Sequence, residues 1–340
     1  SIVLWIIHAL ILSGVRQAAL VNLVTTIAKI APIVLFIAVV ALAFRANIFT
    51  LDFTGAATKG LGSVLTQVKS TMLVTLWVFI GIEGASVVSG RAERRRDIGA
   101  ATIAGFLITL ALYALVSVLS LGIMSQSNLA ALKNPSMAGV LAHVVGPWGA
   151  ALIDIALTIS VFGAFLSWTV LAAEIPFVAS RDGTMPRFFG RANAKGSPTL
   201  SLWVTNGLVQ LFLIITLFAN STYQALFSIA SVAILVPYIF SGAYSLKLAL
   251  AGEAGAQRSD MLIGAVATVY GLWLVYAAGP AYLFMAAILY APGVIFYLWA
   301  RGEQKARLFH PFEALLAVLL IAAGVAAAWL MYTGAINPLS

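Results

Sequence analysis

The feature that most constrains this chain is a series of long apolar runs separated by short polar gaps. A helix needs about 20 apolar residues to cross a bilayer, because it rises about 1.5 Å per residue through a hydrocarbon core about 30 Å thick. Runs of this kind recur from one end of the chain to the other. The pattern predicts ten membrane segments: 2–15, 18–44, 70–90, 99–124, 147–180, 200–219, 223–250, 259–278, 280–300 and 312–335.

Composition supports the same class. Hydrophobic residues make up 62% of the 340 residues and charged residues only 9%, whereas about a quarter of an ordinary soluble domain is charged. We therefore predict an all-α integral membrane protein, with residues 1–340 forming a single transmembrane domain. The fifth segment is longer than a bilayer requires, so we expect it either to extend beyond the membrane or to break near Pro176. The absence of cysteine excludes disulfides and thiolate metal sites.

The lysines and arginines predict the orientation, because cytoplasmic loops carry an excess of both residues. If the loop after the first segment is cytoplasmic, 14 of the 19 basic residues lie on that side. Loops 91–98, 181–199, 251–258 and 301–311 are then cytoplasmic. The net charge of +8 sits in these short gaps, which is typical of membrane orientation and argues against nucleic acid as a partner. The 14 cytoplasmic basic residues are Arg16, Arg91, Arg94, Arg95, Arg96, Arg181, Arg187, Arg191, Lys195, Lys247, Arg258, Arg301, Lys305 and Arg307; Arg45, Lys59, Lys69 and Lys133 lie opposite, and Lys29 lies inside a helix.

This orientation places Ser1 outside, at the start of a short apolar run. The run has no initiator methionine and no positively charged signal-peptide region before it. We therefore expect an N-terminally truncated fragment that lacks an odd number of helices.

The stretch TLWVFIGIEGASVVSGRAERRR, residues 75–96, conflicts with a continuous membrane helix. A charge at the bilayer centre costs roughly 2.5–3.5 kcal/mol on insertion scales, and glycine costs about 1 kcal/mol more than alanine inside a helix. Discontinuous helices near the midplane free backbone groups for substrate binding. We predict an interruption within residues 79–86, with backbone hydrogen bonds absent around Gly81 and Gly84 and Glu83 the one acid at mid-depth. The alternative is a packing face of small residues.

Lys29 lies about eleven residues into its segment, near the bilayer midplane at roughly 1.5 Å per residue. Asn22, Thr25 or Thr26, and Lys29 share one helical face. The alternative for this lysine is snorkelling to the interface.

Several long motifs in order resemble the amino acid–polyamine–organocation transporters. The basic amino acid/polyamine antiporter family is most similar, and within it the bacterial arginine–ornithine antiporters. The resemblance implies a LeuT-type fold with two inverted five-helix repeats and substrate between broken helices 1 and 6. The first segment here then matches helix 4, so helices 1–3 are missing and residues 1–340 form a single, partial transporter domain that runs from helix 4 to the C-terminus of the family pattern. The motifs are LWVFIGIEGASVVSGRAERRRDIGAATIAGF, NPSMAGVLAHVVGPWGA, SWTVLAAEIPFVASRDGTMPRFFGRANAKGSP and SVAILVPYIFSGAYSLKLAL.

The resemblance implies roles for individual residues. Trp77 and Trp168 match positions that stack on the substrate, where a cation over an indole face gains about 0.5–2 kcal/mol. Glu83 and Tyr238 match a gate, and Lys29 matches a lysine that replaces the ion of sodium-coupled relatives. A core or interface role for Tyr238 and an interface role for Trp77 stay open. The implied substrate-binding residues are Trp77, Ile80, Gly81, Gly84, Trp168 and Ser231, and the gating or proton-linked residues are Glu83, Tyr238 and Lys29.

The expected function is exchange of cationic amino acids, arginine for ornithine first and lysine as a further substrate, in the bacterial inner membrane. One alternative is a proton-coupled permease for lysine or another amine. A second, of another class, is a channel or an accessory membrane subunit, although a channel would require repeated pore-lining polar residues. We expect no enzymatic activity, cofactor or metal, and the resemblance also suggests a homodimer. The tryptophans Trp5, Trp148, Trp203, Trp299 and Trp329 fit an interfacial belt.

Overall fold

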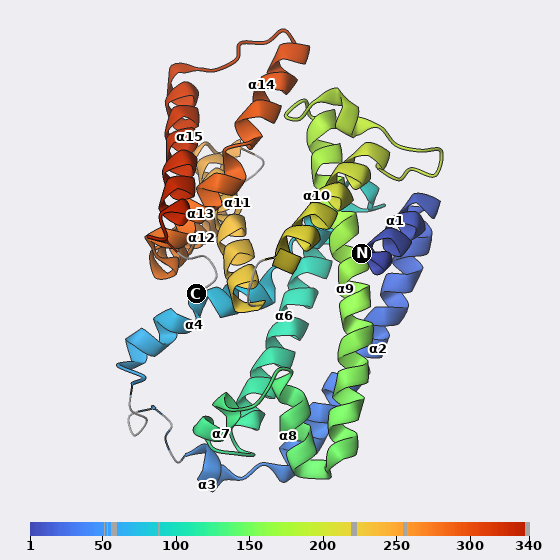
Figure 1. Cartoon of the computed structure of the whole chain (residues 1–340), viewed down its shortest axis with the longest axis vertical. Helices are drawn as coiled ribbons and strands as arrows, with labels where there is room; N and C mark the ends of the chain where they lie inside the picture. The colour runs from blue at the N-terminus through green and yellow to red at the C-terminus, as the bar shows by residue number, and fades with distance from the viewer. Residues whose placement is uncertain are drawn as a thin grey trace. The chain divides into compact units, whose positions relative to one another are not determined.

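The computed structural model describes residues 1–336 except 51, 53, 56–59, 88, 219–222 and 254–256. Helices account for most of this part of the chain, and one isolated bridge joins Ala192 to Pro198 (Figure 1). The predicted all-α class is confirmed. Some predictions fall outside the described residues: parts of the loop 251–258, and the side chains of Arg16, Asn22, Lys59, Arg91, Arg95 and Arg96.

Each of the ten predicted segments corresponds to a helix or to a pair of helices. Eight helical stretches in the described part are long and apolar enough to cross a membrane, and α1 is shorter, with 12 residues. The main helices are α1 (Ile2–Ser13), α2 (Val15–Ala43), α4 (Val64–Phe79), α5 (Gly84–Val87), α6 (Arg95–Ser120), α9 (Pro147–Arg181), α10 (Thr199–Phe218), α11 (Tyr223–Leu250), α12 (Arg258–Ala278), α13 (Pro280–Tyr290), α14 (Gly293–Glu303) and α15 (Pro311–Tyr332).

Shorter helices lie between these segments: α3 (Ala46–Phe49), α7 (Gln126–Ala130) and α8 (Ser136–Val145), with 3-10 turns at Ser89–Arg91 and Arg187–Gly190. The apolar pattern did not predict α8, whose ten residues are too few for a membrane segment. The ninth segment is divided between α13 and α14 at Pro292, because a proline lacks the N–H that continues a helix.

α9 runs without a break through Pro176 for 35 residues, so the alternative of a break at this proline is wrong. Proline leaves the carbonyl four residues earlier without its helical donor, and here that carbonyl belongs to Ala172. The hydroxyl of Thr205 in α10 lies 3.4 Å from this oxygen and donates to it. A neighbouring helix therefore supplies the missing hydrogen bond.

The chain divides into two compact units that alternate along the sequence. Unit 1 comprises Ser1–Val64, Gly81–Asp182 and Arg187–Leu213, and unit 2 comprises Leu65–Ile80, Gly183–Pro186 and Ile214–Ser340. The chain passes from unit 2 to unit 1 between Ile80 and Gly81, inside the stretch where the sequence predicts a broken helix. The single transporter domain remains a prediction.

In unit 1, α2 packs along α9 (Figure 1). The two helices approach closely at Gly163, where a Cβ atom would lie 2.3 Å from the Thr25 hydroxyl oxygen. Small residues of this kind let membrane helices pack by van der Waals contact. One buried cluster includes Phe36, Val40 and Leu141, and a second includes Ile11, Leu166 and Leu202.

In unit 2, α11 packs against α12 and α13 against α15. Glycines make both approaches possible: a Cβ at Gly264 would lie 2.7 Å from the Leu246 backbone nitrogen, and one at Gly324 would lie 3.1 Å from the Ala291 Cβ. A third buried cluster is formed by Leu76 of α4, Leu235 of α11 and Leu274 of α12. Unit 2 is therefore built around α11.

Candidate functional site

The helix of the third segment is interrupted where the sequence predicts it. α4 ends at Phe79, a turn occupies residues 80–83, and α5 begins at Gly84. Gly81 has φ = +107°, a conformation that L side chains rarely adopt. The expectation that backbone hydrogen bonds are absent here is wrong in one respect, because the Gly84 N–H donates to the Gly81 carbonyl at 3.0 Å.

Glu83 bonds to the backbone of the interruption itself. The Gly81 N–H donates to its Oε2 atom at 2.9 Å, and the Glu83 carbonyl accepts from the N–H groups of Ser86 and Val87, at 2.8 and 3.1 Å. A carboxylate bound to a backbone N–H makes a charge-assisted bond that is stronger than one between neutral groups. Glu83 thus stabilises the turn and caps the helix that follows.

Trp168 of α9 lies against the interruption. A Cβ atom at Gly81 would lie 3.1 Å from Cζ2 of the Trp168 ring, and one at Gly84 would lie 3.2 Å from Cδ1 of Leu171. Trp168 is still 42% exposed, so the described part of the chain does not enclose this residue. The predicted residues Gly81, Glu83, Gly84 and Trp168 therefore come together within unit 1.

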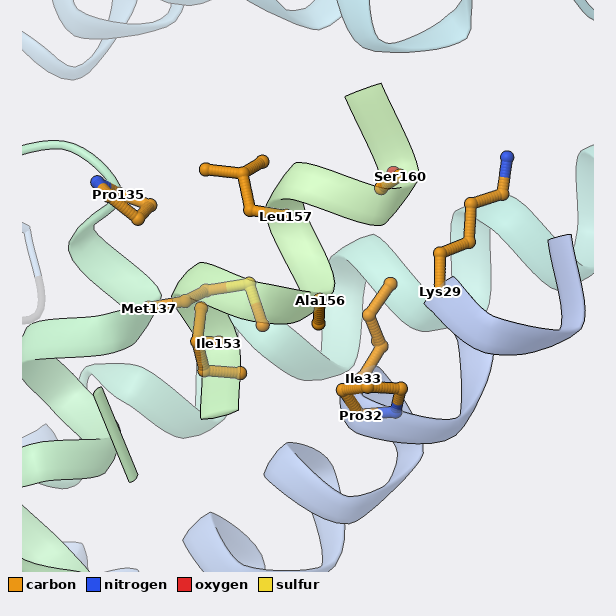
Figure 2. Close-up of a pocket in the computed structure, with 9 residues that line it drawn as sticks. All are labelled: Lys29, Pro32, Ile33, Pro135, Met137, Ile153, Ala156, Leu157 and Ser160. Atoms are coloured by element: carbon orange, nitrogen blue, oxygen red, sulfur yellow. The ribbon is translucent and has the colours of Figure 1, made fainter. Parts of the chain in front are cut away.

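Lys29 lines a pocket of about 120 Å³ between α2, α9 and the start of α8. Its amine and the Ser160 hydroxyl are the polar side-chain groups among the lining residues, and Figure 2 shows both on the side away from Pro135 and Met137. Thr25 meets α9 one turn earlier, at Gly163. The face predicted to contain Thr25 and Lys29 is therefore the face that packs on α9.

The predicted residues of unit 2 lie around one face of α11. Ser231, Leu235 and Tyr238 are four and three residues apart, so they share that face. Ser231 and Leu235 are fully buried, and Tyr238 packs in the Leu76 cluster together with Ile80. Trp77 precedes the interruption by one turn of α4, and its carbonyl accepts from the Ile80 N–H at 3.2 Å. The roles of all these residues remain predictions.

No sequence pattern singles out His8, which is buried in the structure with only 3% of its surface exposed. Its Nδ1 atom lies 2.9 Å from the Asn206 side-chain amide of α10, and its ring packs on Trp203 at 4.3 Å and Trp5 at 5.2 Å between centroids. Trp5 and Trp203 therefore contribute to a contact between helices in addition to any interfacial role. Only their proximity in space reveals the pair, because His8 and Asn206 are 198 residues apart.

Glu174 is a second residue that sequence reasoning set aside, because it lies near the end of its segment. The structure leaves it only 4% exposed in α9. A buried acid in a membrane helix normally has a partner and a role, and an apolar pattern does not indicate which end residues are covered by neighbouring helices.

Comparison with known proteins gives a consistent result. A sequence model of the amino acid permease family matches residues 1–329. The arginine/ornithine antiporter of Pseudomonas aeruginosa is 46% identical over 98% of this chain and 72% of its own length. A putative arginine/ornithine antiporter of Escherichia coli is 46% identical over 97% of this chain and 70% of its own length. An arginine/agmatine antiporter of Chlamydia pneumoniae is 43% identical over 90% of this chain and 65% of its own length.

Proposed function

Because the chain belongs to the amino acid permease family, we propose that it is a multi-pass membrane antiporter that exchanges cationic amino acids, most directly arginine for ornithine. The family agrees with the LeuT-type fold that the sequence predicts. The main support for cationic amino acids as substrates is the 46% identity to arginine/ornithine antiporters over nearly the whole chain.

The geometry of unit 1 supports this proposal. A cationic substrate requires a negative or aromatic partner at a place where the helical backbone is open. The interruption at Gly81 provides the open backbone, Trp168 lies against it, and one carboxylate oxygen of Glu83 is occupied by the Gly81 N–H. In the proposal, the Trp168 ring stacks on the guanidinium, and Glu83 acts as a gate beside the substrate.

Arginine/agmatine exchange is the second candidate. Relatives with that name are 39–43% identical to this chain. Agmatine lacks the carboxylate of ornithine, so the two exchange reactions are distinguished by the counter-substrate alone.

The location and assembly belong to the same proposal. The charge distribution supports a bacterial inner-membrane location, with loops 91–98, 181–199, 251–258 and 301–311 in the cytoplasm. A homodimer is proposed from the family resemblance alone. Crosslinking in the membrane would test the dimer, and labelling of single cysteines introduced into the four loops would test the orientation.

The deciding experiment uses proteoliposomes that contain the complete protein and are preloaded with labelled arginine. Efflux should require an external substrate and should be supported by ornithine. Efflux into buffer alone would indicate a channel or uniporter, and uptake driven by a pH gradient into empty vesicles would indicate a proton-coupled permease. Efflux supported by agmatine but not by ornithine would favour the second candidate.

A further inference from the structure

Pro237 interrupts the hydrogen bonding of α11. This proline lies within the helix and has no N–H to give to the carbonyl four residues earlier, which belongs to Ala233. In a membrane helix such a carbonyl must find another donor, because lipid supplies none. The phenol of Tyr290, the last residue of α13, donates a hydrogen bond to this Ala233 oxygen.

The same solution occurs independently in unit 1. Pro176 of α9 frees the Ala172 carbonyl, which accepts from the Thr205 hydroxyl of α10 at 3.4 Å. In both units, a hydroxyl of a neighbouring helix replaces the bond that proline removes. The two helices concerned, α9 and α11, are also the helices that contain Trp168 and Tyr238.

The Ala233 carbonyl lies between two predicted site residues. Ser231 precedes it and is fully buried, and Tyr238 directly follows Pro237 and packs in the Leu76 cluster. Prolines are the usual points at which long helices bend, and Pro237 lies between Ser231 and Tyr238. The angle of α11 at Pro237 therefore sets the direction of Tyr238 relative to Ser231, and a hydrogen bond to the Ala233 carbonyl restrains that angle.

We propose that Tyr290 is a positioning residue for the transport site. It acts through α11: its phenol holds the Ala233 carbonyl and so fixes the bend that places Tyr238 relative to Ser231. This rests on the proposed function in so far as Ser231 and Tyr238 belong to the substrate site. Tyr290 itself has no contact with the substrate in this proposal.

The test is a double-mutant cycle in the complete protein, with Tyr290→Phe, Pro237→Ala and the two combined. Tyr290→Phe removes only the hydroxyl, and Pro237→Ala restores an N–H that can bond the Ala233 carbonyl. Tyr290→Phe alone should raise the KM for external arginine by up to about tenfold, the equivalent of the full free energy of one such hydrogen bond, because Tyr238 is then no longer held relative to Ser231. In the Pro237→Ala background the same change should alter KM by less than about twofold, because the carbonyl is then satisfied within the helix.

Ser241→Ala is the matched control. The Ser241 hydroxyl also donates to a carbonyl of α11, that of Pro237, at 2.8 Å. In a helix, that carbonyl also accepts from the backbone N–H of residue 241. Removing the Ser241 hydroxyl therefore leaves the carbonyl with a hydrogen-bond donor and should leave KM unchanged. An increase in KM for Tyr290→Phe that is equally large in both backgrounds would overturn the proposal, as would no increase in either.

A second measurement does not depend on transport. Tyr290→Phe should increase deuterium uptake by the peptide that covers residues 238–245. In the Pro237→Ala background, adding Tyr290→Phe should not increase the deuterium uptake of this peptide. Unchanged uptake in Tyr290→Phe would overturn the positioning role, even if exchange is observed. If the unmodified protein exchanges no cationic amino acid, the proposed function fails, while deuterium uptake still decides whether Tyr290 restrains α11.

Discussion

The backbone N–H of Gly81 donates to the carboxylate of Glu83, two residues further along the chain, at 2.9 Å. The acid that the sequence places at mid-membrane is therefore part of the interruption as well as a candidate for handling charge. A substitution at Glu83 can act on the backbone turn, on the substrate or on both. Two different substitutions at Glu83 separate the effect on the turn from the effect on the substrate.

Glu83→Gln should retain the turn, because the glutamine carbonyl oxygen can accept the Gly81 N–H in place of the carboxylate. If Glu83 gates by protonation, this variant should still bind arginine and should lose the dependence of exchange on pH between about 5 and 8. The measurement is arginine binding and exchange over that range in the complete protein. A variant whose pH profile matches the unmodified protein would exclude the gating role.

Glu83→Ala should behave differently, because it removes the acceptor as well as the charge. We expect less folded protein in the membrane, since the Gly81 N–H loses its charge-assisted bond. Equal amounts of folded protein from the alanine and glutamine variants would show that the hydrogen bond between Gly81 and Glu83 does not stabilise the fold.

Gly81→Ala should abolish most exchange. The residue has φ = +107° and its new Cβ would lie 3.1 Å from the Trp168 ring, so backbone strain of order 1–3 kcal/mol is added to the displacement of Trp168. Gly99→Ala is the matched control, because no atom lies within 4 Å of a Cβ there and its helix conformation accepts alanine. Exchange assays and the yield of folded protein check both variants, and normal exchange in Gly81→Ala would contradict the placement of Trp168.

Trp168→Leu should raise the KM for arginine by about 2- to 30-fold, the equivalent of a cation–π contact worth about 0.5–2 kcal/mol. Trp299→Leu, in α14, should leave KM unchanged, because that residue is predicted to lie at the membrane interface. Substrate titrations of both variants measure the difference. Equal effects on KM would remove the stacking role of Trp168.

His8 and Asn206 should be coupled in stability. Replacing either one by leucine leaves a buried polar partner unpaired, whereas replacing both removes the polar pair altogether. We expect a coupling free energy of about 0.6–2 kcal/mol, the range measured for hydrogen bonds between membrane helices. Thermal unfolding of the two single variants and the double variant in detergent measures it, with exposed His143→Leu as a neutral control. Strictly additive losses would show that the pair contributes no coupling.

The sequence by itself determined the class, the segments and the break. Apolar run length depends only on bilayer thickness, so the ten segments could be predicted without knowledge of packing. The interruption could also be predicted, because two glycines and a glutamate in an apolar run oppose a continuous helix regardless of its neighbours. The motifs around Gly81 and Glu83 were sufficient to indicate the family that the comparisons confirmed.

The tertiary structure decided how the interrupted backbone is satisfied. The sequence could not show that Pro176 leaves α9 unbroken, because the Thr205 hydroxyl that replaces the lost bond comes from a different helix. It could not show that His8 is buried against Asn206, or that Tyr290 bonds the carbonyl freed by Pro237. The sequence shows which backbone and side-chain groups require a hydrogen-bond partner. It does not show which residue supplies that partner, because the contacts lie between segments far apart in the chain and form only when the helices pack.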